Sequence, residues 1–125
     1  MKVLRSMKTI LILDKDNRIL SVVDDIMYLG NFNVHITFDP NAVYEKAKTL
    51  KPDLVILDYL LLNDECAEIC RDFKEDHELQ STPLIVVTAY KSKRVPQEAY
   101  NCDALFVKPL DVSLFASKVD YLTAS

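Results

Sequence analysis

Five short runs of mainly apolar residues recur along the chain, separated by stretches in which apolar positions follow a helical spacing. The runs read "KTILILD", "NVHITF", "DLVILDYL", "PLIVVTAY" and "ALFVKPL". Near-continuous Val, Ile and Leu, rather than strict alternation with polar residues, is typical of strands that are covered on both faces. The pattern therefore predicts five buried strands.

The stretches between the runs predict five helices. The first covers residues 17–30, with Ile19, Val23 and Ile26 on one face, Asp16 or Asn17 as the cap and Gly30 at its end. The others are expected after Pro40, over 64–79, around 92–101 and from about 112 to 122, on the apolar positions Val43, Ala47, Leu50, Cys66, Ile69, Cys70, Phe73, Phe115, Val119 and Leu122.

Strand and helix alternate five times, which predicts the fold class. Right-handed crossovers between parallel strands place helices on both faces of one sheet, and a closed barrel would need eight such units. We therefore expect a single α/β domain over residues 1–125: an open, parallel five-stranded sheet of order 2-1-3-4-5, the flavodoxin-like (βα)5 arrangement. No separate output domain is expected within these residues.

Composition narrows the class of protein further. The formal charge of −4 comes from interspersed acidic and basic residues, so no basic patch indicates direct nucleic-acid binding. No apolar run approaches the roughly 18 residues that span a bilayer. The apolar segment near the amino terminus is too short for a signal peptide. We expect a cytoplasmic protein without membrane contact.

The three cysteines are an odd number, which fits a reducing compartment. Cys66 and Cys70 share an apolar helical stripe with Ile69 and Phe73, so core packing is favoured over a metal or redox pair.

The chain has a single glycine, so other residues must form its turns. Asn and Asp tolerate the left-handed region better than other residues do. Asn63 and Asn101 are therefore predicted to have positive φ.

Polar side chains end four of the apolar runs: Asp14, Asp58, Thr88 and Lys108. Ligands of open α/β sheets bind at the carboxyl ends of the strands, where strands one, three and four are neighbours in the expected order. Two adjacent carboxylates repel unless a cation joins them, and carboxylate oxygens suit Mg²⁺. An aspartate nucleophile, Mg²⁺, a lysine and a hydroxyl together predict a phosphoryl acceptor.

The chain resembles, from end to end, the receiver domains of bacterial two-component response regulators. "ILILD", "DLVILD", "TPLIVVTA" and "VKPL" are similar to the family's four motifs. The resemblance implies these roles: phosphoacceptor, Asp58; Mg²⁺ ligands, Asp14, Asp58 and the backbone carbonyl of Leu60; switch hydroxyl, Thr88; ion-pair partner of the phosphoryl group, Lys108. It also implies a cis peptide bond before Pro109.

The sequence departs from the family's pattern after Asp14. The family usually has a second acid there, which binds the metal, whereas this chain has Lys15. An ammonium at about 6 Å from Mg²⁺ would cost roughly 1 to 5 kcal/mol, which is about tenfold to several thousandfold in affinity. Alternatively, Lys15 extends into solvent and Asp16 supplies a carboxylate, or the ammonium replaces part of the metal's charge.

Three further positions are expected to modify the pocket. Leu60 and Tyr90 stand two residues after the acceptor and the hydroxyl, at positions that in the family flank the attacking water, and the resemblance implies that large groups there would hinder this water. We therefore expect slow self-dephosphorylation, with a half-life above about a minute. Leu105 stands where the family often carries an aromatic switch residue, while Phe106, on the other side of the strand, is predicted to be core.

Two functions remain open from the sequence. In the first, a histidine kinase or phosphotransfer protein phosphorylates Asp58, and the face formed by the fourth helix, fifth strand and fifth helix changes its downstream protein partner or forms a homodimer. In the second, the domain is a pseudo-receiver that binds a partner without phosphorylation, as Lys15 suggests. An enzyme acting on a small molecule is not expected, because no glycine-rich loop or nucleophile with a histidine base is present.

Overall fold

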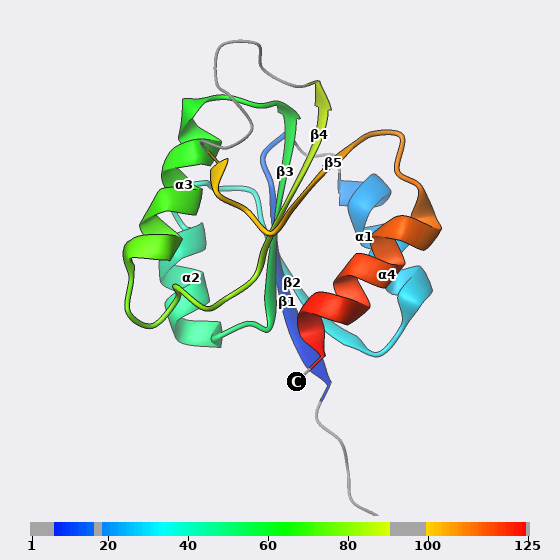
Figure 1. The fold of residues 1–125 in the computed structure, drawn as a ribbon, viewed down its shortest axis with the longest axis horizontal. Coiled ribbons are helices and arrows are strands. Elements are labelled where there is room, and N and C mark those ends of the chain that lie inside the picture. The colour runs from blue at the N-terminus through cyan, green and yellow to red at the C-terminus, as the bar shows by residue number, and fades with distance from the viewer. Residues whose placement is uncertain (1–6, 17–18, 91–99, 125) are drawn as a thin grey trace, which may run out of the picture.

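The computed structural model describes residues 7–16, 19–90 and 100–124, and these form a five-stranded parallel sheet between two layers of helices (Figure 1). The strand order is β2-β1-β3-β4-β5, as predicted. The elements are β1 (Lys8–Asp14), α1 (Ile19–Leu29), β2 (Phe32–Thr37), α2 (Val43–Leu50), β3 (Leu54–Leu61), α3 (Asp64–Glu75), β4 (Leu84–Tyr90), β5 (Ala104–Val107) and α4 (Val112–Thr123).

The helices divide between the two faces of the sheet. Figure 1 shows α2 and α3 on one face and α1 and α4 on the other. Side chains of the central strand β3 pack in both layers, because alternate side chains of a strand point to opposite faces of the sheet. Leu57 packs in the cluster under α2 and α3, and Ile56 in the cluster under α1 and α4. The near-continuous apolar runs therefore reflect strands buried on both faces.

Several predicted boundaries need correction. The helix expected over 64–79 ends at Glu75, because the carboxylate of Asp76 accepts the next backbone N–H groups. Strands three and four do not end at Asp58 and Thr88: β3 continues to Leu61 and β4 to Tyr90, while β5 stops one residue before Lys108. In α1, Val22 is buried with Ile26, whereas the expected Val23 is only partly buried. The helix expected around 92–101 lies almost entirely outside the described residues.

Positive φ occurs at different residues from those predicted, apart from Asn101 at 49°. The prediction for Asn63 is wrong: it has an extended backbone, and its side chain accepts the N–H of Cys66 as the N-cap of α3. Asn31 and Lys51 also have positive φ. Gly30, at +69°, follows the end of α1 as expected.

The cysteine prediction is confirmed. Cys66, Cys70, Ile69 and Phe73 are all buried in the cluster between α2, α3 and the sheet. The cysteine side chains therefore belong to the core.

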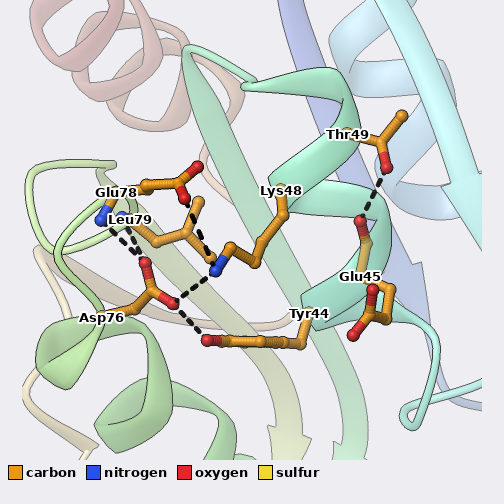
Figure 2. Close-up of polar contacts among 7 residues, drawn as sticks. All are labelled: Tyr44, Glu45, Lys48, Thr49, Asp76, Glu78 and Leu79. Atoms are coloured by element: carbon orange, nitrogen blue, oxygen red, sulfur yellow. Dashed lines mark hydrogen bonds and ion pairs between the residues drawn. The ribbon is translucent and has the colours of Figure 1, made fainter.

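A polar cluster ties α2 to the segment after α3 (Figure 2). The Tyr44 hydroxyl donates to Asp76 Oδ2, and Lys48 Nζ lies 3.1 Å from the same oxygen. Asp76 Oδ1 accepts the N–H groups of Glu78 and Leu79 at 2.7 and 3.1 Å. These donors, the Tyr44 hydroxyl first, lower the pKa of Asp76 to about 2, and the same bond raises the pKa of Tyr44.

In the described part of the chain, no helix is both long enough and apolar enough to cross a membrane.

Candidate functional site

Two buried carboxylates lie at the carboxyl edge of the sheet. Asp14 ends β1 and is paired in register with Asp58 on the adjacent strand β3. Asp14 is 1% exposed and Asp58 is 2% exposed. Because ionised carboxylates are costly to bury without compensation, this edge must supply positive charge or hydrogen bonds to both.

Lys108 provides part of that compensation. Its Nζ donates to Asp58 Oδ2 at 3.1 Å, and its side chain is only 11% exposed. The backbone places it there: the Lys108 N–H donates to the Thr88 carbonyl at 2.8 Å and so extends the pairing of β5 with β4. The peptide bond between Lys108 and Pro109 is cis, as the resemblance implied.

Thr88 is fully buried beside the segment that follows Asp58. Its Oγ1 lies 2.9 Å from the carbonyl oxygen of Tyr90 and 3.2 Å from that of Leu60, so its single proton has two acceptors. The same oxygen accepts the Tyr90 N–H. The hydroxyl is therefore held by backbone groups of β3 and β4, next to the carbonyl that sequence reasoning assigned to the metal.

The loop after β1 contacts β3 at two points. The Lys15 N–H donates to the Asp58 carbonyl at 3.1 Å, and the Leu60 N–H donates to Asp16 Oδ2 at 2.7 Å. Lys15 is half-buried, and no ion pair joins its ammonium to a carboxylate of the described residues. The sequence indicated Asp16 as a candidate ligand but not its contact with Leu60.

The positions expected to modify the pocket have different environments. Leu60 is half-buried, whereas the Tyr90 side chain is 64% exposed. Leu105 packs partly buried against the cluster under α2 and α3. Phe106 is also partly buried and packs on the opposite face against the core cluster, with its ring centroid 5.3 Å from that of the buried Phe115.

One contact near the site was missed by sequence reasoning. Tyr59, the residue after Asp58, is buried, and its hydroxyl donates to Glu65 Oε1 of α3 at 2.8 Å. Burial, followed by this hydrogen bond, raises the pKa of Tyr59 well above its usual range. The bond joins the end of β3 to the first turn of α3, and a tyrosine six residues before a glutamate gave no sign of it.

The oxygen atoms at this edge are chemically suited to Mg²⁺. They comprise two carboxylates, Asp14 and Asp58, and the backbone carbonyl of Leu60. Within the described ranges no three side chains of Cys, His, Asp or Glu are grouped to hold a metal. Two carboxylates nevertheless fit Mg²⁺, which commonly keeps several waters and binds one or two carboxylates together with a phosphate.

Comparisons with known proteins agree on one family. The family model for the response regulator receiver domain matches residues 10–120. The response regulator ArlR of Staphylococcus saprophyticus is 31% identical over 116 residues, which cover 90% of this chain and 51% of that protein. The chain thus spans about half the length of the curated relatives it matches.

Solved structures share the fold at low sequence identity. One is the signal receiver domain of a signal transduction histidine kinase from Syntrophus aciditrophicus, with a TM-score of 0.77, 22% identity, and coverage of 93% of this chain and 89% of that one. Another is the BeF3-activated N-terminal receiver domain of RstA from Klebsiella pneumoniae, with a TM-score of 0.75, 16% identity, and coverage of 94% and 100%.

Proposed function

This chain belongs to the family of response regulator receiver domains of two-component signalling, and we propose that it accepts a phosphoryl group on Asp58. The single observation that carries the proposal is the ion pair between Lys108 and Asp58, formed at a buried edge of the sheet beside a second carboxylate. A cation that already faces the acceptor can stabilise the negative charge of a transferring group without reorganisation.

The proposed donor is a phosphohistidine of a histidine kinase or phosphotransfer protein. A carboxylate oxygen of Asp58 attacks phosphorus, an oxygen–phosphorus bond forms, and the bond from phosphorus to the histidine nitrogen breaks. The electron pair of that bond stays with the imidazole, which takes up a proton from solvent. Lys108 Nζ lies 3.1 Å from Asp58 Oδ2, which supports a role for it in holding an oxygen of the incoming group.

Asp14, Asp58 and the Leu60 carbonyl would hold Mg²⁺ in the proposed site. The ion, when bound, neutralises charge on the phosphoryl oxygens and on the paired carboxylates. Asp14 is buried in register with the acceptor, which supports this assignment over a role as a surface turn residue.

Thr88 is proposed to couple the phosphoryl group to the rest of the domain. Its hydroxyl is bound to the backbone of Leu60 and Tyr90, and a phosphoryl oxygen would compete for its proton. Loss of these bonds would free the end of β4 to move. The surface that a downstream protein binds would then change its conformation. A homodimer through the surface around β5 and α4 is one form of that output.

A pseudo-receiver that binds its partner without phosphorylation is the competing function. Only Lys15 favours it, and the Lys108–Asp58 pair speaks against it. Both functions use the same fold, so chemistry at Asp58 separates them.

The test is the intact mass of the protein after incubation with phosphoramidate, with and without Mg²⁺. We expect a gain of about 80 Da, the mass of one phosphoryl group, that depends on Mg²⁺. Asp58→Asn is the matched variant, because it keeps the shape of the side chain and removes the nucleophile. A gain that persists in Asp58→Asn places the modification elsewhere, and no gain from folded wild-type protein would favour the pseudo-receiver.

A further inference from the structure

The pairing of β1 with β3 ends at the candidate site. Backbone pairing continues as far as Asp14 and Asp58, and the Lys15 N–H adds one more bond to the Asp58 carbonyl. β1 stops at Asp14, whereas β3 runs on to Leu61. The last residues of β3 therefore lack a strand on the β1 side.

A side chain takes the place of the missing strand. In a parallel pair, a strand residue that faces its neighbour donates its N–H to a backbone carbonyl of that neighbour. The Leu60 N–H instead donates to Asp16 Oδ2, at the short distance of 2.7 Å that is typical of a bond to a charged acceptor. On its other side, β3 is held by β4 through the pair Leu61 and Tyr90 and through the bond from the Leu62 N–H to the Tyr90 carbonyl.

We propose that Asp16 is a positioning residue for the acceptor segment, and not a ligand of the metal. Its carboxylate fixes Leu60, two residues after the proposed phosphoacceptor, and so sets where the Leu60 carbonyl lies for Mg²⁺. This inference rests on the proposed function for its consequence in phosphoryl transfer. The hydrogen bond from the Leu60 N–H to the Asp16 carboxylate, called the clamp below, is nevertheless a property of the unmodified protein.

Exposure and geometry favour this role over direct metal binding. Asp16 is exposed, whereas Asp14 and Asp58 are buried. Its carboxylate therefore lies outside the buried part of the sheet edge where Asp14 and Asp58 are paired. One of its oxygens is already committed to the Leu60 N–H. The Leu60 carbonyl is in turn contacted by the Thr88 hydroxyl at 3.2 Å, so the clamp and the switch hydroxyl hold the same residue.

The experiment compares Asp16→Ala with Asp16→Asn. Asparagine keeps an oxygen that can accept the Leu60 N–H, and alanine does not, while both remove one negative charge. Asp120→Ala, which removes an exposed carboxylate in α4, is the matched control for net charge. Two quantities are measured by NMR: amide hydrogen exchange at Leu60 and at the core residue Leu57 without metal, and Mg²⁺ affinity by titration.

In Asp16→Ala we expect exchange at Leu60 to be about tenfold faster, with Leu57 unchanged, because one hydrogen bond to a charged acceptor is lost locally. Mg²⁺ affinity should fall about tenfold, as for other groups that orient a metal ligand. Asp16→Asn should restore slow exchange and lose no more than about threefold in affinity from its charge.

Two results would overturn the clamp. One is exchange at Leu60 that is as slow in Asp16→Ala as in wild type. The other is an equal and large loss of Mg²⁺ affinity in both variants, which indicates a direct ligand. A wild-type protein that gains no mass from phosphoramidate would refute the proposed function. Amide exchange at Leu60 would still test the clamp, because it is measured without a phosphodonor.

Discussion

Lys15 is the residue that most separates this site from the family's pattern, and its backbone and side chain act differently. The backbone N–H is used in the structure, since it donates to the Asp58 carbonyl. The ammonium forms no ion pair with a carboxylate of the described residues. The effect that we expect from it is the long-range repulsion of a cation.

Replacing Lys15 with Asp should therefore tighten Mg²⁺ binding by at least about tenfold, because the change removes a positive charge and adds a negative charge beside the ion. Lys15→Gln removes only one charge and should give an intermediate affinity. Calorimetric titration of the three proteins measures the series. Equal affinities would mean that the ammonium is too well solvated to influence the site.

The sequence allowed the central residues of the site to be predicted, but not the contacts around them. Asp14, Asp58 and Lys108 come together because each lies at or near the carboxyl end of its strand, and the carboxyl ends of parallel strands share one edge. The Asp16–Leu60 and Tyr59–Glu65 hydrogen bonds depend on loop geometry and side-chain torsions. Neither follows from periodicity or spacing.

At the scale of elements, the end of α3 shows how a local hydrogen bond overrides a pattern. The apolar spacing predicted a helix as far as residue 79, and Leu79 is indeed buried in the same cluster as Phe73. Asp76 instead accepts the N–H groups of Glu78 and Leu79 and gives the backbone an alternative to the helix. Leu79 still reaches the core, from a turn.

The same carboxylate predicts a dependence of stability on pH. The pKa of Asp76 in the folded protein is about 2, below its usual value of 3.8, mainly through the Tyr44 hydroxyl. Its ionised form thus stabilises the fold above about pH 4, and this contribution is lost as the pH falls towards 2. In Asp76→Asn, the urea midpoint should fall less between pH 6 and pH 2.5 than in wild type. The control is Asp120→Asn.

If Asp76→Asn and wild type lose the same fraction of their midpoint on acidification, the link between α2 and the end of α3 does not depend on the charge of Asp76.

At the scale of the whole molecule, the sheet joins two separate apolar layers into one unit. Phe73 of α3 is fully buried on one face and Phe115 of α4 on the other. The strand order could be predicted because the alternation of strands and helices leaves few right-handed arrangements. Which residues of a helix are most deeply buried was predicted less well: in α1 Val22 is buried, while Val23 is only partly buried against the same cluster.

Phe73→Ala and Phe115→Ala should each lower the free energy of unfolding by about 3 to 5 kcal/mol. Because β3 packs in both layers, each variant should still unfold in a single transition. Urea unfolding followed by far-UV circular dichroism and by tyrosine fluorescence should give coincident curves. A curve with two steps in either variant would show that the layers are separate cooperative units.

The placement of the cysteines has a consequence for labelling chemistry. All three belong to the layer under α2 and α3: Cys66 and Cys70 are buried in it, and Cys102 packs against it. The hydrogen bond with Cys70 and burial raise the pKa of Cys66, and burial raises that of Cys102 to about 11, so few thiolates exist at neutral pH. An alkylating reagent should therefore react with the buried Cys66 and Cys70 only as fast as this layer opens, whereas Cys102 is partly exposed. The opposite layer carries no thiol in the described residues. The rate of alkylation, measured before and after phosphorylation, would show whether phosphorylation changes the opening of this one layer of the sheet.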